Sequence, residues 1–140
     1  MTDPDFLDTN ILVYAYDPSD LKKQRIAREL VRKAVVGESA ISTQVLAEFA
    51  ATLLHKMKPA ARFKDVTTAL DALGPIHIIR PDAEIVRRAV EARSMYGMHF
   101  YDGMIVASAE RAHCPRIWSE DFNAGQTYFG SKVENPFSQD

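Results

Sequence analysis

Four carboxylates stand where the sequence is otherwise apolar or rich in small residues: Asp8, Glu48, Asp102 and Asp121. Asp8 directly follows the apolar pair Phe6-Leu7, and Asp121 comes just after a strand-like run at residues 116–119. In open α/β sheets, ligands bind at the carboxyl ends of the strands, where such side chains would gather. Carboxylate oxygens are also the ligands that Mg²⁺ and Mn²⁺ prefer. We therefore expect the four carboxylates to converge on a divalent metal ion.

A metal ion would resolve the repulsion within such a cluster. Like charges held close together raise each other's pKa, so four unpaired carboxylates would be costly. Mg²⁺ and Mn²⁺ neutralise carboxylates and retain several waters, one of which can be activated to attack a phosphoryl group. Thr9 and Asn10 follow Asp8 directly. We expect their polar side chains to orient the metal ligands through hydrogen bonds.

Each carboxylate also has an ordinary structural interpretation. Asp8 can be a turn or helix-cap residue, Asp102 is typical of the first turn of a helix, and Glu48 can be an exposed helix charge. Glu120 stands beside Asp121, and adjacent residues of an extended segment point to opposite sides, so we expect only one of the two to face the site. Spacing alone leaves these alternatives open.

The elements that must position these residues alternate between strands and helices. We expect a first strand at Phe6-Leu7 that extends into the apolar run 11–14, and further strands at residues 40–42, 76–79 and 116–119, with a final edge strand at Val133. This order predicts a mainly parallel central sheet covered by helices on both faces, a three-layer α/β/α sandwich. With no linker or repeat in the sequence, residues 1–140 are expected to form one domain.

The helices are predicted from apolar residues that recur every three or four positions. One should lie between Asp20 and Gly37, one should be capped by Thr43, and one should begin at Pro59 with Phe63 facing inward. Two more are expected after Asp82 and at residues 99–109. The helix after Asp82 should turn four residues toward the core: Ile85, Val86, Ala89 and Val90.

Composition excludes several classes of protein. Lys and Arg number 17 against 19 Asp and Glu, giving a net charge of -2, so the chain is no polycationic nucleic-acid wrapper. The single cysteine, Cys114, rules out an intramolecular disulfide framework and is expected to be a packed thiol. The acidic residues near Met1 do not resemble a signal peptide, and no apolar run reaches the roughly 18 residues of a membrane span. We therefore expect a cytoplasmic protein that does not enter the membrane.

Four stretches of the sequence resemble the signature motifs of PIN-domain ribonucleases, most closely the VapC toxins of bacterial toxin–antitoxin pairs. They are Phe6-Leu7-Asp8-Thr9-Asn10, residues 42–49, which contain Glu48, residues 101–109, which begin with Tyr101-Asp102, and Trp118-Ser119-Glu120-Asp121-Phe122. The four stand in the family's order and span almost the whole chain. The resemblance implies an α/β/α fold and an endoribonuclease that depends on Mg²⁺ or Mn²⁺.

The resemblance also implies roles for individual residues. The acidic site would consist of Asp8, Glu48, Asp102 and Asp121. Asp8, Asp102 and Asp121 would hold the metal, Glu48 would complete the shell or orient the attacking water, and Thr9, Asn10 and Ser119 would support them. A homodimer and a small antitoxin, which is not part of this chain, are the implied partners. Gly103 stands where the family commonly has alanine.

The contacts with the RNA substrate are less defined by the sequence. The basic candidates are Arg25, Lys56, Lys58 and Arg62, and His99 is either structural or faces the substrate. Exposed apolar side chains on the helices at residues 43–73 would suit a partner helix.

Three rival functions are open. A phosphatase of the haloacid-dehalogenase type is disfavoured, because Asn10 stands where that chemistry needs a second aspartate. A PIN nuclease that processes RNA without an antitoxin remains an alternative, as does a non-catalytic module that binds RNA or protein. Loss of a site carboxylate would favour the module, and all four are present.

Overall fold

The computed structural model describes residues 3–138, and their centre is a six-stranded sheet in the order β3-β2-β1-β4-β6-β5. The strands are β1 (Asp5–Leu7), β2 (Ser39–Ser42), β3 (His77–Ile79), β4 (Arg116–Trp118), β5 (Thr127–Tyr128) and β6 (Ser131–Glu134). All neighbouring pairs are parallel except β5 with β6. β1 lies at the centre, where Phe6 is in register with Ala40 on one side and with Ile117 on the other.

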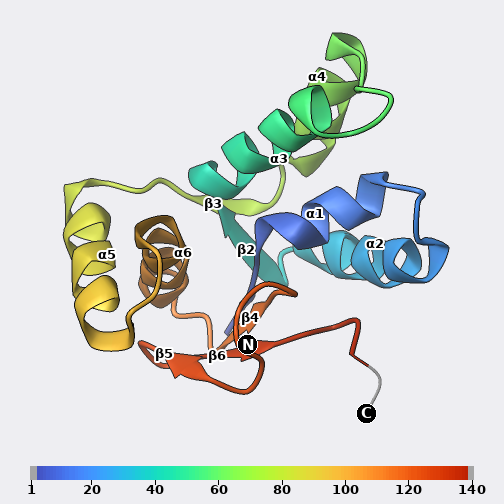
Figure 1. Cartoon of the computed structure of the whole chain (residues 1–140). Helices are drawn as coiled ribbons and strands as arrows, with labels where there is room; N and C mark the ends of the chain where they lie inside the picture. The colour runs from blue at the N-terminus through green and yellow to red at the C-terminus, as the bar shows by residue number, and fades with distance from the viewer. Residues whose placement is uncertain (1–2, 139–140) are drawn as a thin grey trace.

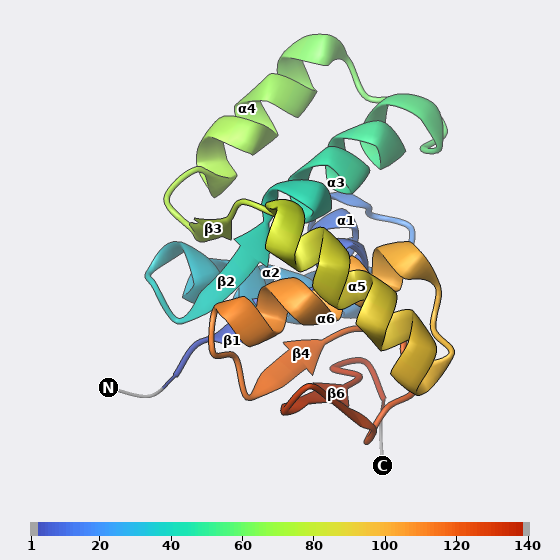
Figure 2. The ribbon, with the colours of Figure 1, turned by 90° about the vertical axis from the view of Figure 1, so that its left-hand side faces the viewer.

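Helices cover both faces of this sheet. They are α1 (Thr9–Tyr16), α2 (Leu21–Val35), α3 (Thr43–His55), α4 (Phe63–Leu73), α5 (Ala83–Tyr96) and α6 (Phe100–Arg111). Figure 1 shows α5 and α6 on one face and α1 and α2 on the other, and Figure 2, turned by 90°, shows α5 and α6 in front of the strands. The helices α3 and α4 pack together beyond β2 and β3. The predicted three-layer α/β/α sandwich is therefore confirmed.

The core is built from the sheet residues that both helical layers cover. Phe6, Ile41 and Ile117 are fully buried on the three central strands, and Phe49 and Val106 are fully buried on the helices. Burial of one such side chain contributes roughly 1.5–3 kcal/mol of transfer free energy. Cys114 is also buried, and burial raises the pKa of its thiol to about 12. The prediction of a packed thiol is confirmed.

Two element boundaries differ from the sequence prediction near the first and the fourth helix. Residues 11–14 do not extend the first strand but lie in α1, which turns Ile11, Leu12 and Ala15 into the core. An apolar run this short is equally compatible with a buried strand and a buried helix turn. The other difference is that α4 begins at Phe63 rather than at Pro59, so Phe63 lies at the helix end and is exposed instead of facing inward.

Two smaller predictions were also wrong. Ser42, not Thr43, caps α3, because the Ser42 hydroxyl accepts a hydrogen bond from the amide of Val45 at 3.2 Å. Val133 lies on β6, which is inside the sheet, while the short β5 forms the edge. Within the described residues, no helix is long and apolar enough to cross a membrane.

The buried face of α5 differs from the predicted one and explains Gly103. Ile85, Ala89 and Ala92 are buried there, whereas Val86 and Val90 are 43% and 56% exposed. The small alanines let α6 approach closely. A Cβ atom on Gly103 would lie 2.8 Å from the Ala89 carbonyl oxygen and 3.3 Å from the Ala92 Cβ. Glycine at position 103 is therefore required by the packing of α5 against α6.

We expect Gly103→Ala to lower the free energy of unfolding by about 1–2 kcal/mol. Overpacking costs about 1–3 kcal/mol, and the better helix propensity of alanine returns up to about 1 kcal/mol. Urea denaturation of the two proteins measures the difference. Ser108→Ala on the same helix is the control, because the buried Ser108 hydroxyl has no hydrogen-bond partner among the described residues and its removal should not destabilise. Equal stability of Gly103→Ala and the unaltered chain would contradict the packing argument.

Candidate active site

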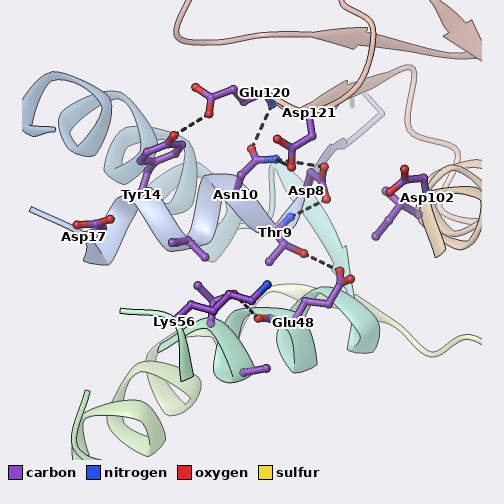
Figure 3. Close-up of a pocket in the computed structure, with 14 residues that line it drawn as sticks. Asp8, Thr9, Asn10, Tyr14, Asp17, Glu48, Lys56, Asp102, Glu120 and Asp121 are labelled. Carbon is purple, nitrogen blue, oxygen red and sulfur yellow. Dashed lines mark hydrogen bonds between the residues drawn. The ribbon is translucent and has the colours of Figure 1, made fainter. Parts of the chain in front are cut away.

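The carboxyl ends of neighbouring parallel strands bring the predicted acidic residues to one cavity. Asp8 follows β1 and Asp121 lies three residues after β4, the parallel neighbour of β1. Glu48 comes from α3 and Asp102 from α6. All four line a cavity of about 530 Å³, which Figure 3 shows together with the other residues that line it. The structure therefore brings the four predicted carboxylates to one cavity.

Asp8 is the most buried of the four carboxylates, with 6% of its surface exposed. It caps α1, since its Oδ1 accepts a hydrogen bond from the Thr9 amide at 2.7 Å, and its Oδ2 accepts one from the Ser119 hydroxyl at 2.7 Å. Burial raises the pKa of Asp8 to about 6; these two hydrogen bonds oppose the rise, and the charges of Asp121 and Glu48 add to it. Asp8 is thus both the helix cap of the alternative interpretation and part of the acidic cluster.

Asn10 joins Asp8 to the segment that follows β4. Its Nδ2 atom lies 3.0 Å from Asp121 Oδ2 and 3.3 Å from Asp8 Oδ2, close enough to donate to both carboxylates. Its Oδ1 atom accepts a hydrogen bond from the Glu120 amide at 3.2 Å. Ser119 completes the link, because its hydroxyl donates to Asp8 and accepts from the Asp121 amide at 3.1 Å. Asn10 and Ser119 are therefore placed to orient the carboxylates.

Thr9 makes the corresponding link to α3. Its Oγ1 atom donates a hydrogen bond to Glu48 Oε1 at 2.9 Å, across 39 residues of sequence. Figure 3 shows Glu48 extended from α3 toward Thr9 and the other acidic residues. Glu48 is exposed to solvent, but its carboxylate is held by this hydrogen bond and is not a free surface charge. The hydroxyl of Thr9 fixes one oxygen of the carboxylate and leaves the other available.

Asp102 lies in the first turn of α6, as predicted, and is half-buried beside the cavity. Burial raises its pKa, the charge of His99 opposes this, and the charges of Glu48 and Asp121 add to it. His99 itself caps α6, with its Nδ1 accepting a hydrogen bond from the Tyr101 amide at 3.2 Å. The structural interpretation of His99 is therefore supported, and its ring stacks on that of Tyr101 with centroids 5.8 Å apart.

The predicted basic residues do not gather in one place. Lys56 lines the cavity, but Lys58 and Arg62 are not among its lining residues. Arg62 instead pairs with Asp65 at 3.1 Å. Arg25 lies on α2, where it lines two other surface grooves. Of the four basic side chains, Lys56 alone faces the acidic cluster.

The cavity is also lined by residues to which the sequence analysis assigned no role in the site, among them Tyr14, Asp17 and Glu120. Glu120 and Asp121 both line it, contrary to the expectation that only one would, but their carboxylates point to different partners. Asp121 accepts from Asn10, whereas Glu120 accepts from Tyr14 and Lys23. Burial acts to raise the pKa of Glu120, but the hydrogen bonds from Lys23 and Tyr14 outweigh it and hold the pKa below its ordinary value.

The donor set suits a hard divalent cation. All of the converging acidic side chains offer oxygen. A cation would relieve the repulsion between them, which adds to the effect of burial in raising the pKa of Asp8 and Asp102. Among residues 3–138, no three His, Cys, Asp or Glu side chains are already gathered closely enough to hold an ion.

The sequence model of the PIN domain matches residues 6–130. The chain belongs to the PIN-domain family. The match includes all four acidic residues that line the cavity, and the resemblance noted from the four motifs is confirmed at the level of the family. Among curated protein sequences, none is significantly similar to the chain.

Three solved structures share the fold of this chain. A chain of a toxin-antitoxin complex from Klebsiella pneumoniae has a TM-score of 0.71 at 20% identity, over 96% of this PIN domain and 99% of that chain. A chain of VapBC2 from Rickettsia felis, bound to a DNA fragment from its promoter, gives 0.65 at 20% identity, covering 93% and 96%. A chain of FitAB bound to a DNA fragment gives 0.69 at 18% identity, covering 96% of both chains. At these identities the likeness establishes a shared fold.

Proposed function

We propose that this PIN domain is an endoribonuclease that depends on Mg²⁺ or Mn²⁺. The observation that carries the proposal is the convergence of Asp8, Glu48, Asp102 and Asp121, from four separate stretches of sequence, on one cavity. Membership of the PIN family, whose members are generally nucleases, supports it.

In this proposal, Asp8, Asp102 and Asp121 hold the cation through their carboxylates. A bound cation supplies neutralisation of the negative charge on the scissile phosphate. Glu48 completes the site or orients the attacking water with the oxygen that Thr9 leaves free. Asn10 and Ser119 keep Asp8 and Asp121 in place through their hydrogen bonds. Lys56 is positioned to attract the RNA backbone, and Arg25, Lys58, Arg62 and His99 remain predicted contacts farther along it.

We expect Thr9→Val to reduce cleavage about tenfold, because Glu48 loses the hydroxyl that orients its carboxylate. Valine keeps the branched shape of threonine, so packing should change little. Thr9→Ser retains the hydroxyl and should keep most of the activity. Initial cleavage rates on one RNA, measured for the three proteins at the same metal concentration, test this. Full activity of Thr9→Val, or equal losses in both variants, would contradict a specific role of the hydroxyl.

We propose further that the chain acts as the toxin of a toxin–antitoxin pair. The similar fold in a toxin-antitoxin complex supports a toxin that is neutralised by a small antitoxin. In the same proposal the toxin is cytoplasmic and forms a homodimer. A PIN nuclease that processes RNA without an antitoxin is the second candidate. A small protein encoded beside this chain that suppresses its cleavage would distinguish the toxin from the processing enzyme.

RNA cleavage by the purified chain tests the proposal. We expect cleavage of single-stranded RNA with Mg²⁺ or Mn²⁺, complete loss in EDTA, and recovery when Mn²⁺ is added in excess. Several structured and unstructured RNAs should be used, because PIN-family substrates are not identified by the cavity alone. Cleavage that persists in EDTA would contradict the metal dependence. Binding of RNA or Mn²⁺ without any cleavage would favour the non-catalytic module.

A further inference from the structure

Glu120 forms a cluster with two residues that the proposed mechanism does not use. Lys23 Nζ lies 2.5 Å from Glu120 Oε2, and the Tyr14 hydroxyl donates to Glu120 Oε1 at 2.6 Å. Both oxygens of the Glu120 carboxylate are therefore occupied. The three side chains come from α1, α2 and the segment after β4, separated by as many as 106 residues in the sequence. Each of the three residues is partly buried.

Aromatic contacts hold the cation of this cluster in place. Lys23 Nζ lies 4.8 Å from the centre of the Tyr14 ring and 5.5 Å from that of Phe137. The two rings meet edge to face with centroids 5.0 Å apart. Such contacts stabilise an ammonium group and limit its movement. The Lys23 ammonium thus has a fixed position against Glu120, unlike most surface lysines.

The position of Glu120 in the chain gives this cluster a consequence for the acidic site. Glu120 lies between Ser119 and Asp121, both of which bond within the site. Its amide donates to Asn10, while its side chain is drawn toward α2, away from the side on which Asp121 lies (Figure 3). Holding Glu120 by both its backbone and its carboxylate therefore fixes the direction in which Asp121 points.

We infer that Tyr14, Lys23 and Glu120 form an anchor that positions Asp121 for metal binding, with Glu120 acting as a positioning residue and not as a ligand. This inference rests on the proposed metal site. Without the anchor, the segment 119–121 can turn, and Asp121 has to be ordered again each time a cation binds. Loss of such an outer partner typically weakens metal affinity about 10- to 100-fold.

Mn²⁺ titration calorimetry on the RNA-free protein tests the anchor through Lys23→Met. Removing a positive charge beside an acidic site should, by charge alone, tighten cation binding. Loss of the anchor should weaken it, so the two effects have opposite signs. We expect Lys23→Met to bind Mn²⁺ about tenfold more weakly, and Lys23→Arg, which keeps the cation, to remain within about threefold of the unaltered chain. Tyr14→Phe, which changes no charge, should weaken binding in the same direction.

Three further variants make the outcome decisive. Lys22→Met removes an exposed charge from the adjacent position of α2 and should bind Mn²⁺ as tightly as the unaltered chain or slightly more tightly. The double variant of Lys23→Met and Glu120→Gln should bind only slightly more weakly than Lys23→Met alone, because both changes break one anchor and only the loss of the Glu120 charge is added. Asp121→Asn should lose binding most severely. Thermal unfolding of each variant confirms that it is folded during the titration.

The possible failures can be told apart. Tighter Mn²⁺ binding by Lys23→Met would overturn the anchor, because only the effect of the removed positive charge would then be seen. Unchanged binding by Lys23→Met and Tyr14→Phe, with a loss in Asp121→Asn, would overturn the anchor and leave the metal site standing. No Mn²⁺ binding by the unaltered chain would overturn both the anchor and the proposed site.

Discussion

Asp102→Asn is expected to reduce metal-dependent RNA cleavage by more than about 100-fold, beyond the usual cost of losing an outer partner of a metal ligand. Asparagine keeps the shape of the side chain in the first turn of α6 and removes the charge that faces the cavity. Because the pKa of Asp102 is already raised by burial and by its acidic neighbours, the change relieves repulsion and should not unfold the protein. Cleavage rates with Mg²⁺ and with Mn²⁺ measure the loss.

Asp71→Asn is a matched control for Asp102→Asn. Asp71 lies exposed on α4 and does not line the cavity. The control makes the same chemical change and should leave cleavage unchanged. Equal cleavage by the Asp102→Asn variant and the unaltered chain would show that the activity comes from another site or from a contaminating nuclease.

The metal-free protein is expected to become less stable as the pH rises through about 6. The folded-state pKa of Asp8 is about 6, above its ordinary value of 3.8, so the folded chain binds a proton more tightly than the unfolded chain. The stability gained from this proton is fully present below pH 3.8 and is lost as the pH rises through 6. Two units of pKa correspond to about 3 kcal/mol in total, of which about 1 kcal/mol should be lost between pH 5 and 7.5. The raised pKa of Asp102 acts in the same direction.

Urea denaturation in EDTA at pH 5 and 7.5 measures this difference. Carboxylates with lowered pKa values, such as Asp82 at about 2, lose their stabilising charge only below pH 5. They therefore do not change the free energy of unfolding between pH 5 and 7.5. In Asp8→Asn, which has no proton to lose, the decline should be smaller. Mg²⁺ at pH 7.5 should stabilise the unaltered chain and not Asp8→Asn. A free energy of unfolding that rises from pH 5 to 7.5 in the unaltered chain would contradict the raised pKa of Asp8.

Much of the fold could be predicted because its signals are local. The cap at Asp20, the glycine at the end of α5 and the apolar spacing of each helix all act within a few residues. The parallel sheet could be predicted as well, because strands that alternate with helices along the chain pair in parallel. Within the candidate site, Asp8, Asp102 and Asp121 were predictable because each follows a strand or begins a helix, and such positions meet at one edge of the sheet.

The parts that could not be predicted depend on contacts between distant residues. Residues 11–14 form a helix because Asp8 caps it and the core accepts Ile11 and Leu12, which a run of four apolar residues does not reveal. Val86 and Val90 fit a helical stripe, but the close approach of α6 at Gly103 selects the face with Ala89. The bond between Tyr14 and Glu120 joins residues 106 positions apart, and no spacing rule connects them.

Anomalous X-ray diffraction from Mn²⁺-soaked crystals would test the proposed metal site most directly. We predict an anomalous peak inside the cavity, in contact with the carboxylates of Asp8 and Asp102, with Asp121 turned toward it. Crystals of the Asp102→Asn variant, soaked in the same way, should lack the peak. A peak held by other residues, or a cavity without one in crystals of the unaltered chain, would contradict the assignment of these carboxylates to a metal ion.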